Sequence, residues 1–161
     1  MSDIQRAGTT QRYSDYTVHN GVVYCVEVPP DEHADVATQT AAMLASVETL
    51  LTRAGSGKDR LLLATLYLTD MNDYDAVNAV WDAWVPAGTA PTRACVQVTR
   101  LAAPGWKVEV AVQAALSGGA QTHFAHHDKA VSAAAHPRQL RVASFTSRQP
   151  CLYLCDRRMT R

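Results

Sequence analysis

The chain has 161 residues, of which 47% are hydrophobic and 19% charged, with fifteen basic and fifteen acidic side chains. This length suits one domain of ordinary size, and the composition is that of a globular protein rather than a disordered or fibrous one. No apolar run approaches the roughly 18 residues of a membrane-spanning helix, and the polar N-terminus lacks the apolar core of a secretory signal. We therefore expect a cytoplasmic protein without a membrane partner.

The balanced charge conceals an asymmetry along the chain. Residues 1–117 contain eight Lys/Arg and thirteen Asp/Glu, whereas residues 118–161 contain seven and two. A basic tail can bind an acidic partner or nucleic acid, but a solvated, poorly ordered extension is the more common case. We expect one domain over 1–117 and a poorly ordered basic extension over 118–161. Four cysteines form neither a disulfide framework nor a zinc-ligand spacing: Cys25, Cys95, Cys151 and Cys155.

The first half of the domain predicts a hairpin followed by a helix. In the segment YSDYTVHNGVVYCVEVP, starting at Tyr13, two strands flank Asn20-Gly21, a strong hairpin turn signal. Pro29 and Pro30 end the second strand, because proline cannot donate to a ladder. Asp35 is a suitable N-cap for a helix that continues to Gly55, with apolar residues at three- and four-residue spacing.

The second half predicts a strand, a second helix and two final strands. The strand is DRLLLATLYLTD, and the helix starts at Asn72, where Asn72 and Asp75 resemble a capping box. Trp81 and Trp84 lie on its apolar stripe and are expected to pack in the core or at an interface. The strands TRACVQVTRL and WKVEVAVQAAL follow. The resulting order, β-β-α-β-α-β-β, predicts an α+β domain with both helices on one face of a mixed sheet.

Strand alternation nominates the residues that could carry chemistry. In the last strand the valines at 108, 110 and 112 take the buried face, so Glu109 projects from the other. One strand earlier, Arg93 and Cys95 alternate with apolar residues, and we expect both to share the face of Glu109, away from the helices. Val23, Cys25 and Ala111 are further candidates for that face. An ordinary cross-strand ion pair between Arg93 and Glu109 is the alternative interpretation.

Residues 13–116 resemble the Rid, or YjgF/RidA, family of reactive-intermediate deaminases. The stretches that carry the resemblance are YSDYTVHNGVVYCVEVP, LATLYLTDMNDYDAVNAVWDAW, APTRACVQVTRL and KVEVAVQAA. The D-x-N-D-[FY]-x-x-x-N run and the R-x-C-V-x-V strand are specific when they occur in this order. The short hairpin start and the W-D-A-W helix are most similar to the compact, YoaB-like branch of the family.

The resemblance implies a fold and an activity. The fold would be chorismate-mutase-like, and the chain would form a homotrimer with three clefts between subunits. The reaction would be hydrolysis of 2-iminopropanoate, 2-iminobutanoate and their enamine tautomers to 2-oxo acids and ammonia. An iminium carbon is already electrophilic, so the reaction needs orientation, a polarised water and proton transfer. We therefore expect neither a cofactor nor a metal.

The resemblance also implies roles for individual residues. Arg93 would bind the substrate carboxylate, and Glu109 would position water and shuttle a proton. Cys95 would line the cleft without acting as a nucleophile. Tyr13 matches the tyrosine that opens the first strand in the family, and Tyr74 matches the aromatic residue that begins the second helix. We expect both, together with Cys25, to take part in substrate binding.

Alternatives remain open at this point. Family members usually carry Ser-Gly or Thr-Gly late in the second strand, where this chain has Val26 and Glu27. That change favours a catalytically inactive Rid-fold trimer that binds a small carboxylate or a partner protein, whereas Arg93 and Glu109 favour the deaminase. Nucleic-acid binding and ribonuclease activity find little support, because residues 1–117 are acidic and show no basic aromatic stripe.

Overall fold

The computed structural model describes residues 3–118. The basic extension expected over 118–161 therefore lies, apart from Gly118, outside the described residues, and that expectation stays a prediction. Among residues 3–118, none of the helices combines the length and the apolar character needed to cross a membrane.

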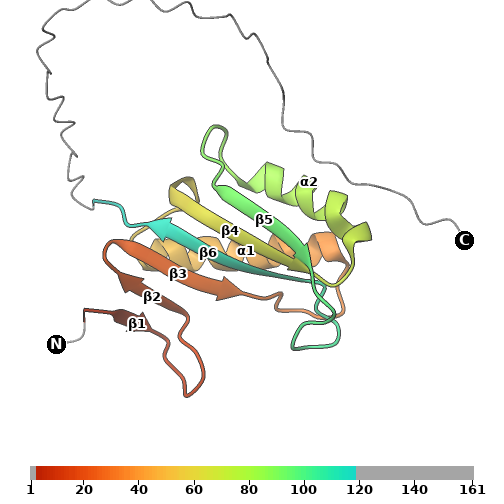
Figure 1. Ribbon diagram of the computed structural model, residues 1–161, viewed down its shortest axis with the longest axis horizontal. Helices are drawn as coiled ribbons and strands as arrows, with labels where there is room; N and C mark the ends of the chain where they lie inside the picture. Colours follow the sequence, from red (N-terminus) through yellow and green to blue (C-terminus); the bar gives the residue numbers. More distant parts are fainter. Residues whose placement is uncertain (1–2, 119–161) are drawn as a thin grey trace, which may run out of the picture. The chain divides into compact units, whose positions relative to one another are not determined.

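Two helices pack on one face of a six-stranded mixed sheet (Figure 1). The strands lie in the order β1-β2-β3-β6-β4-β5, and all neighbours are antiparallel except the parallel pair β4 and β5. The expected placement of both helices on one face is confirmed. In chain order the elements are β1 (Gln5–Ala7), β2 (Tyr16–His19), β3 (Val22–Glu27), α1 (Val36–Arg53), η1 (Lys58–Arg60), β4 (Leu61–Leu68), η2 (Met71–Asp73), α2 (Tyr74–Trp84), β5 (Thr92–Gln97) and β6 (Val108–Ala115).

The predicted hairpin is confirmed, and one strand precedes it. Asn20 and Gly21 both have positive φ, 48° and 77°, as a tight turn between right-twisted strands requires. The added strand β1 pairs with β2 through Gln5–Ala7. Three residues are too few to show an alternating pattern, so no periodic signal marks this strand.

Helix α1 forms as its sequence predicts. The Asp35 carboxylate accepts a hydrogen bond from the backbone N–H of Thr38 at 2.8 Å, which satisfies one of the free donors of the first turn. Gly55, just past the last turn, takes a φ of 81°. The fully buried side chains of α1 pack over the sheet: Met43, Leu44, Val47 and Leu51.

Helix α2 starts differently from the prediction, and the capping box is wrong. Asp70, not Asn72, caps this region: its carboxylate accepts from the backbone N–H of Asn72 at 2.9 Å. That bond begins the 3₁₀ turn of η2, so Asn72 lies inside a turn that precedes the α-helix. Asp73, the residue before α2, makes no side-chain cap bond.

The sheet has a buried face against the helices and an open face. Val108, Val110 and Val112 are buried under the helices, as predicted, and Glu109 projects from the open face. Val23 and Cys25 also face the helices, so the expectation that they lie on the open face was wrong. The reason is register: Cys25 pairs with Val112, and directly opposite residues share a face. Tyr24 and Val26 occupy the open face instead, exposed by 40% and 56%.

Candidate functional site

Arg93 lies on the helix side of the sheet, not on the open face. In the parallel pairing of β4 with β5, Arg93 is opposite Ala64 and Cys95 is opposite Leu66. Ala64 and Leu66 are fully buried under the helices, so Arg93 and Cys95 share that side. The expectation that both accompany Glu109 was therefore wrong. β5 is the edge strand and carries apolar residues on both faces, so its alternation did not reveal which face is covered.

Arg93 stacks on an aromatic ring of α2. Its guanidinium carbon lies 4.8 Å from the centroid of Trp81, whose side chain is almost fully buried. Within residues 3–118, the Nε and Nη2 atoms of Arg93 are buried and have no hydrogen-bond partner, and the Oδ1 atom of Asn78 is in the same condition. An unpaired buried donor is costly unless a ligand or partner completes it. Nε and Nη2 form the edge of a guanidinium that binds a carboxylate through two parallel bonds.

Cys95 is a thiol kept neutral by its surroundings. It packs half-buried against the core. Burial raises the pKa of the Cys95 thiol, and the charge of Arg93 opposes that rise without cancelling it. A thiolate is the nucleophilic form of cysteine, so the environment fits a lining role rather than attack on a substrate.

Glu109 lies on the open face, opposite Tyr67 of β4. Its side chain is half-buried, and this desolvation raises the pKa of its carboxyl above the ordinary value of 4.5. A carboxylate with a raised pKa is a stronger base than an ordinary one and is suited to accept a proton in catalysis. In one chain, however, Glu109 and Arg93 project from opposite faces, with β4 between their strands. The ion pair considered as an alternative cannot form within one chain for the same reason.

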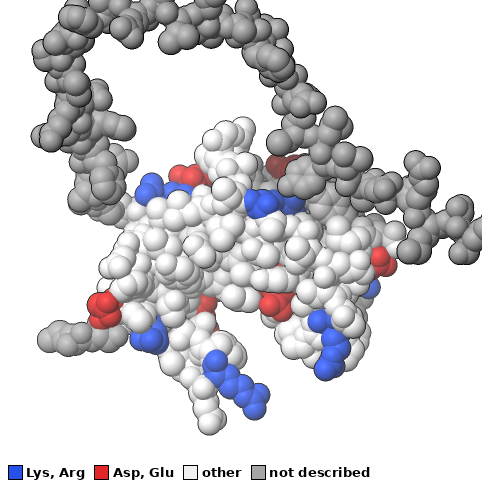
Figure 2. All heavy atoms as spheres, in the orientation of Figure 1, with Lys and Arg blue, Asp and Glu red and all other residues white. Residues whose placement is uncertain are grey.

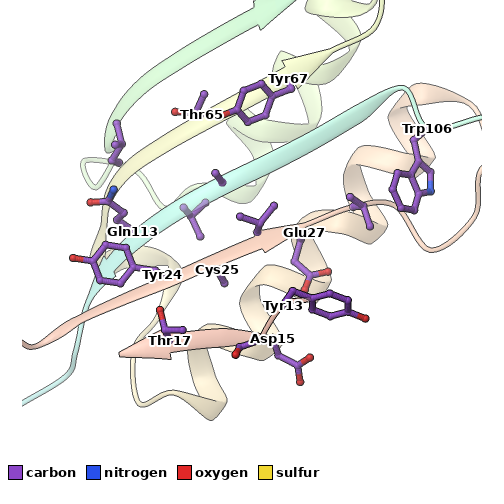
Figure 3. Close-up of a pocket in the computed structure, with 16 residues that line it drawn as sticks. Tyr13, Asp15, Thr17, Tyr24, Cys25, Glu27, Thr65, Tyr67, Trp106 and Gln113 are labelled. Carbon is purple, nitrogen blue, oxygen red and sulfur yellow. The ribbon is translucent and has the colours of Figure 1, made fainter. Parts of the chain in front are cut away.

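A cavity of about 840 Å³ covers part of the open face (Figure 3). Its rim includes Tyr13, which is 67% exposed, and its floor is formed by β3, β6 and β4. Cys25 borders it, but this residue belongs to the hydrophobic core, and burial raises the pKa of its thiol to about 12. The predicted site residues that do not line this cavity are Arg93, Cys95, Glu109 and Tyr74.

The open face around the cavity is mostly uncharged. Figure 2 shows that charged side chains gather at its margins and that its centre is free of them. Several exposed side chains on this face and at its edge are apolar or aromatic: Tyr13, Tyr24, Val26, Leu62 and Val96. An uncharged face of this kind is typical of a surface that another protein copy covers.

Trp81, Asn78 and Glu27 are the site features that sequence reasoning did not place. The apolar stripe of α2 predicts only packing for Trp81, and the three-residue spacing to Asn78 on one helix face is the signal that was available. Glu27 had been noted only as a departure from the family pattern. Glu27 borders the cavity at the end of β3, and because it pairs with Val110 its side chain lies on the helix side of the sheet.

Comparisons with known proteins agree with this architecture. The family model described as Endoribonuclease L-PSP matches residues 4–116. A crystal structure of a YjgF-family protein from Neisseria meningitidis superposes with a TM-score of 0.68 and is 45% identical, covering 71% of this chain and 96% of that one. The chain belongs to the Rid (YjgF/RidA) family. The expected chorismate-mutase-like fold is confirmed for this Rid-family chain.

Two relatives show where the chain lies within the Rid family. The RutC family protein YoaB of Escherichia coli is 43% identical over 113 residues, which is 70% of this chain and 98% of YoaB. TdcF of Escherichia coli, named as a candidate reactive intermediate deaminase, is 36% identical over 70 residues, which is 42% of this chain and 54% of TdcF. The Rid match ends at residue 116, one residue after β6.

Proposed function

We propose that this Rid-family protein hydrolyses 2-imino acids and their enamine tautomers, with 2-iminopropanoate and 2-iminobutanoate as substrates. The observation that carries the proposal is the guanidinium of Arg93, buried on Trp81 with its Nε–Nη2 edge unpaired in the described chain. That edge is complementary to two oxygens of a carboxylate or a phosphate, and a 2-imino acid presents a carboxylate. Family membership and the deaminase name of TdcF support the same type of reaction.

The reaction requires one group that binds the substrate carboxylate and one group that accepts and donates a proton. Arg93 holds the substrate carboxylate and so fixes the position of the neighbouring C2 atom. The ionised Glu109 takes a proton from a water molecule as the water oxygen bonds to C2 of the iminium. Glu109 then returns that proton to the amine nitrogen. As the C–N bond breaks, the hydroxyl proton of the intermediate passes back to Glu109, and the 2-oxo acid and ammonia are formed. The raised pKa of Glu109 makes its carboxylate a stronger base toward the proton of the water molecule.

We further propose that each site lies between two copies of the chain, in a homotrimer. Arg93 and Glu109 project from opposite faces of one sheet, so one copy cannot apply both to the same ligand. The edge strand β5 of one copy, set against the open face of a second, would bring Arg93 of the first toward Glu109 of the second. The uncharged character of that face supports such an assembly.

The deaminase activity is tested with an imine that is generated in situ. A pyridoxal-phosphate dehydratase acting on threonine releases 2-iminobutanoate, and semicarbazide traps the imine that escapes hydrolysis. We expect the protein to reduce semicarbazone formation and to accelerate release of 2-oxobutanoate. Rates equal to the protein-free blank would refute the deaminase, and full activity of Arg93→Ala would refute the role of Arg93.

Subunit sharing is tested by mixing two inactive variants. Arg93→Ala and Glu109→Gln are unfolded and refolded together in equal amounts. If each site takes Arg93 from one copy and Glu109 from another, about one quarter of the sites regain both residues by chance. Recovery of about one quarter of the wild-type activity is expected. No recovery, with mixed oligomers verified by mass spectrometry, would show that one copy supplies both groups.

A second candidate is a trimer that binds a small ligand without turning it over. Val26 and Glu27 favour it, because they replace the small pair that family members usually carry at this point of β3. Under this alternative, 2-oxobutanoate binds in calorimetry and Arg93→Ala abolishes binding, while imine hydrolysis stays at the blank rate. RNA cleavage, which the family model's name suggests, gains no comparable support, because the lining of the described cavity includes no basic side chain to hold phosphates.

A further inference from the structure

The cavity on the open face begins beside Glu109. Tyr67 of β4 lies directly opposite Glu109, and Ala111 follows Glu109 by two residues on the same face of β6. Both Tyr67 and Ala111 line the cavity. In a 2-imino acid, the C2 atom that reacts also carries the side chain. A substrate whose C2 atom lies at Glu109 can therefore extend its side chain into this cavity.

Trp106 and two valines line the end of the cavity that is nearest to Glu109. Val26 pairs with Ala111 in the antiparallel ladder, so the chain that continues to Val28 runs toward Glu109. Trp106 precedes Glu109 by three residues and lines the cavity together with Val26 and Val28. Figure 3 shows Trp106 at the end of the cavity opposite to Tyr24. The space beside Glu109 is therefore bounded by apolar and aromatic side chains.

The loop that carries Trp106 is held on both sides of this residue. The Gln39 side chain of α1, which is 1% exposed, donates to the Gly105 carbonyl at 2.9 Å and accepts from the N–H of Lys107 at 2.9 Å. The Glu32 carboxylate accepts from the N–H of Gly105 at 3.2 Å. A side chain at Gly105 would collide with the Glu32 carbonyl, so the loop also packs closely here. Trp106 is therefore presented by a fixed backbone, which reduces the cost of ordering it around a ligand.

The size and chemistry of the cavity favour an apolar side chain larger than methyl or ethyl. Its volume of about 840 Å³ lies in the range of pockets that hold whole small molecules. Its two acidic neighbours are already engaged: Asp15 is paired with Arg53 at 3.6 Å. Glu27 lies on the helix side, where Ser46 hydrogen-bonds to it. Each methylene group that a substrate buries against such a surface strengthens binding by a factor of about four.

We propose that Trp106 is a specificity-determining residue, the wall of a side-chain subsite beside Glu109 that selects 2-imino acids with a branched or aromatic apolar side chain. This inference rests on the proposed deaminase function and narrows its substrate class. The substrate carboxylate would bind Arg93 of one copy, and C2 would lie at Glu109 of the neighbouring copy. The side chain would pack on Trp106 of that same neighbouring copy. Imines derived from leucine or phenylalanine fit this description.

The test compares two imines that differ only in the size of the apolar side chain. An L-amino-acid oxidase generates one imine from leucine and the other, 2-iminobutanoate, from 2-aminobutanoate. Hydrolysis is followed by competition with semicarbazide and normalised to oxidase turnover. The leucine imine carries two more carbon atoms, so we expect its kcat/KM to exceed that of 2-iminobutanoate by about tenfold. A wild-type ratio of one or less would overturn the subsite while the deaminase stands.

Three variants locate the preference. Trp106→Ala should reduce the ratio of the two kcat/KM values to about one and change kcat/KM for 2-iminobutanoate by less than about threefold, because the ethyl group depends little on the ring. Trp106→Phe keeps an aromatic wall and should keep most of the preference. Met71→Ala removes an apolar side chain that is 38% exposed and lies outside the lining of the described cavity, so the wild-type ratio should persist. A ratio that Trp106→Ala leaves unchanged would overturn the subsite.

A contact between copies is the competing role for Trp106. Size-exclusion chromatography with light scattering separates the two roles, since a residue that serves the substrate alone should leave the mass of the assembly unchanged. We expect Trp106→Ala to match the wild type in mass. A smaller assembly, with equal losses of kcat/KM for both imines, would assign Trp106 to the contact between copies and overturn the subsite.

Failure of the deaminase itself gives a different result, because then neither imine is hydrolysed above the blank. In that case calorimetry with 4-methyl-2-oxopentanoate and 2-oxobutanoate, which have the carbon skeletons of the two imines, tests the subsite without turnover. Tighter binding of the larger acid that is lost in Trp106→Ala would support the subsite. Absence of that preference in the wild type would refute it.

Discussion

Replacing Arg93 with methionine should separate stability from activity. Arg93 makes no hydrogen bond through Nε or Nη2 within the described residues, and both atoms are buried. Its favourable contact is the stack on Trp81 at 4.8 Å. Methionine keeps a flexible apolar stem of similar length, so most of the packing survives. The function of Arg93, by contrast, depends on the two donors that methionine lacks.

The expected change in stability follows from these two contributions. An unpaired buried donor costs about 1–3 kcal/mol, and because Arg93 is only partly buried the low end applies, about 2 kcal/mol for the pair. Loss of the cation–π contact costs about 0.5–2 kcal/mol. The free energy of unfolding of Arg93→Met should therefore equal that of the wild type or exceed it by up to about 1.5 kcal/mol. Activity should fall at least about 100-fold, because two charge-assisted bonds to the carboxylate are lost.

A second arginine provides a matched control. Arg60 uses the same two atoms structurally: Nε donates to the Ala115 carbonyl at 3.0 Å and Nη2 to the Leu116 carbonyl at 2.8 Å. Arg60→Met should therefore lose about 2 kcal/mol of stability and keep its activity. Urea unfolding at one protein concentration, followed by circular dichroism, gives the stabilities, and the imine assay gives kcat/KM. A loss of more than about 2 kcal/mol in Arg93→Met would refute the reasoning, since it would reveal a structural partner for Arg93.

Four further predictions follow from the site and its supports. Trp81→Phe should keep KM for 2-iminobutanoate within about threefold of the wild-type value, because the ring that positions Arg93 is retained. Trp81→Leu should raise KM about tenfold and leave kcat little changed, because the ring is lost. Equal KM values for the two variants in steady-state kinetics would contradict this role of Trp81. The acid limb of the wild-type pH–rate profile should lie above pH 4.5, the ordinary Glu value, and Glu109→Gln should lack activity across the profile; an active Glu109→Gln would exclude it as the proton carrier. Folding raises the pKa of Glu27, so between pH 4.5 and the raised pKa the folded chain binds more protons than the unfolded one. The free energy of unfolding should therefore fall as pH rises through that window. Glu27→Gln should remove this pH dependence in urea titrations, and an unchanged pH dependence would show that Glu27 does not cause it. Gln39→Leu should lower the free energy of unfolding by about 3 kcal/mol. The reason is that the buried Gln39 amide donates to the carbonyls of Ala34 and Gly105 and accepts from the N–H of Lys107. A decrease of less than about 1 kcal/mol would show that water replaces these bonds.

The local elements were predictable from the sequence because their signals are local. Asn20-Gly21 fixes a hairpin through positive φ, and Asp35 caps α1 through a bond to a residue three positions away. The valines of β6 alternate without exception, so the sequence also indicated the face on which Glu109 lies. Each of these inferences needs only a few consecutive residues.

The faces of Arg93 and Cys25 depend on pairings that no short window contains. Cys25 lies under the helices because β3 pairs with β6, more than eighty residues away in the chain. Arg93 lies there because β5 joins the sheet parallel to β4, as an edge strand. Arg93 and Cys95 alternate with Ala94 and Val96, and either pair could have been the covered one. The residues of the candidate site were thus identified by resemblance, and their placement on opposite faces required the sheet register.

The end of β6 bears on how this fold can be extended. The backbone N–H groups of Leu116 and Ser117 donate to the carbonyls of Gly21 and Gly55, and Arg60 holds the carbonyls of Ala115 and Leu116. Those bonds lie at the end of the sheet where β6 meets Val22, whereas Glu27 and Glu109 lie toward its other end. The point at which the described domain ends is therefore held in place, at the end of the sheet opposite Glu27 and Glu109. A fusion partner or affinity tag joined after residue 118 should leave the folding and the turnover of this domain unchanged.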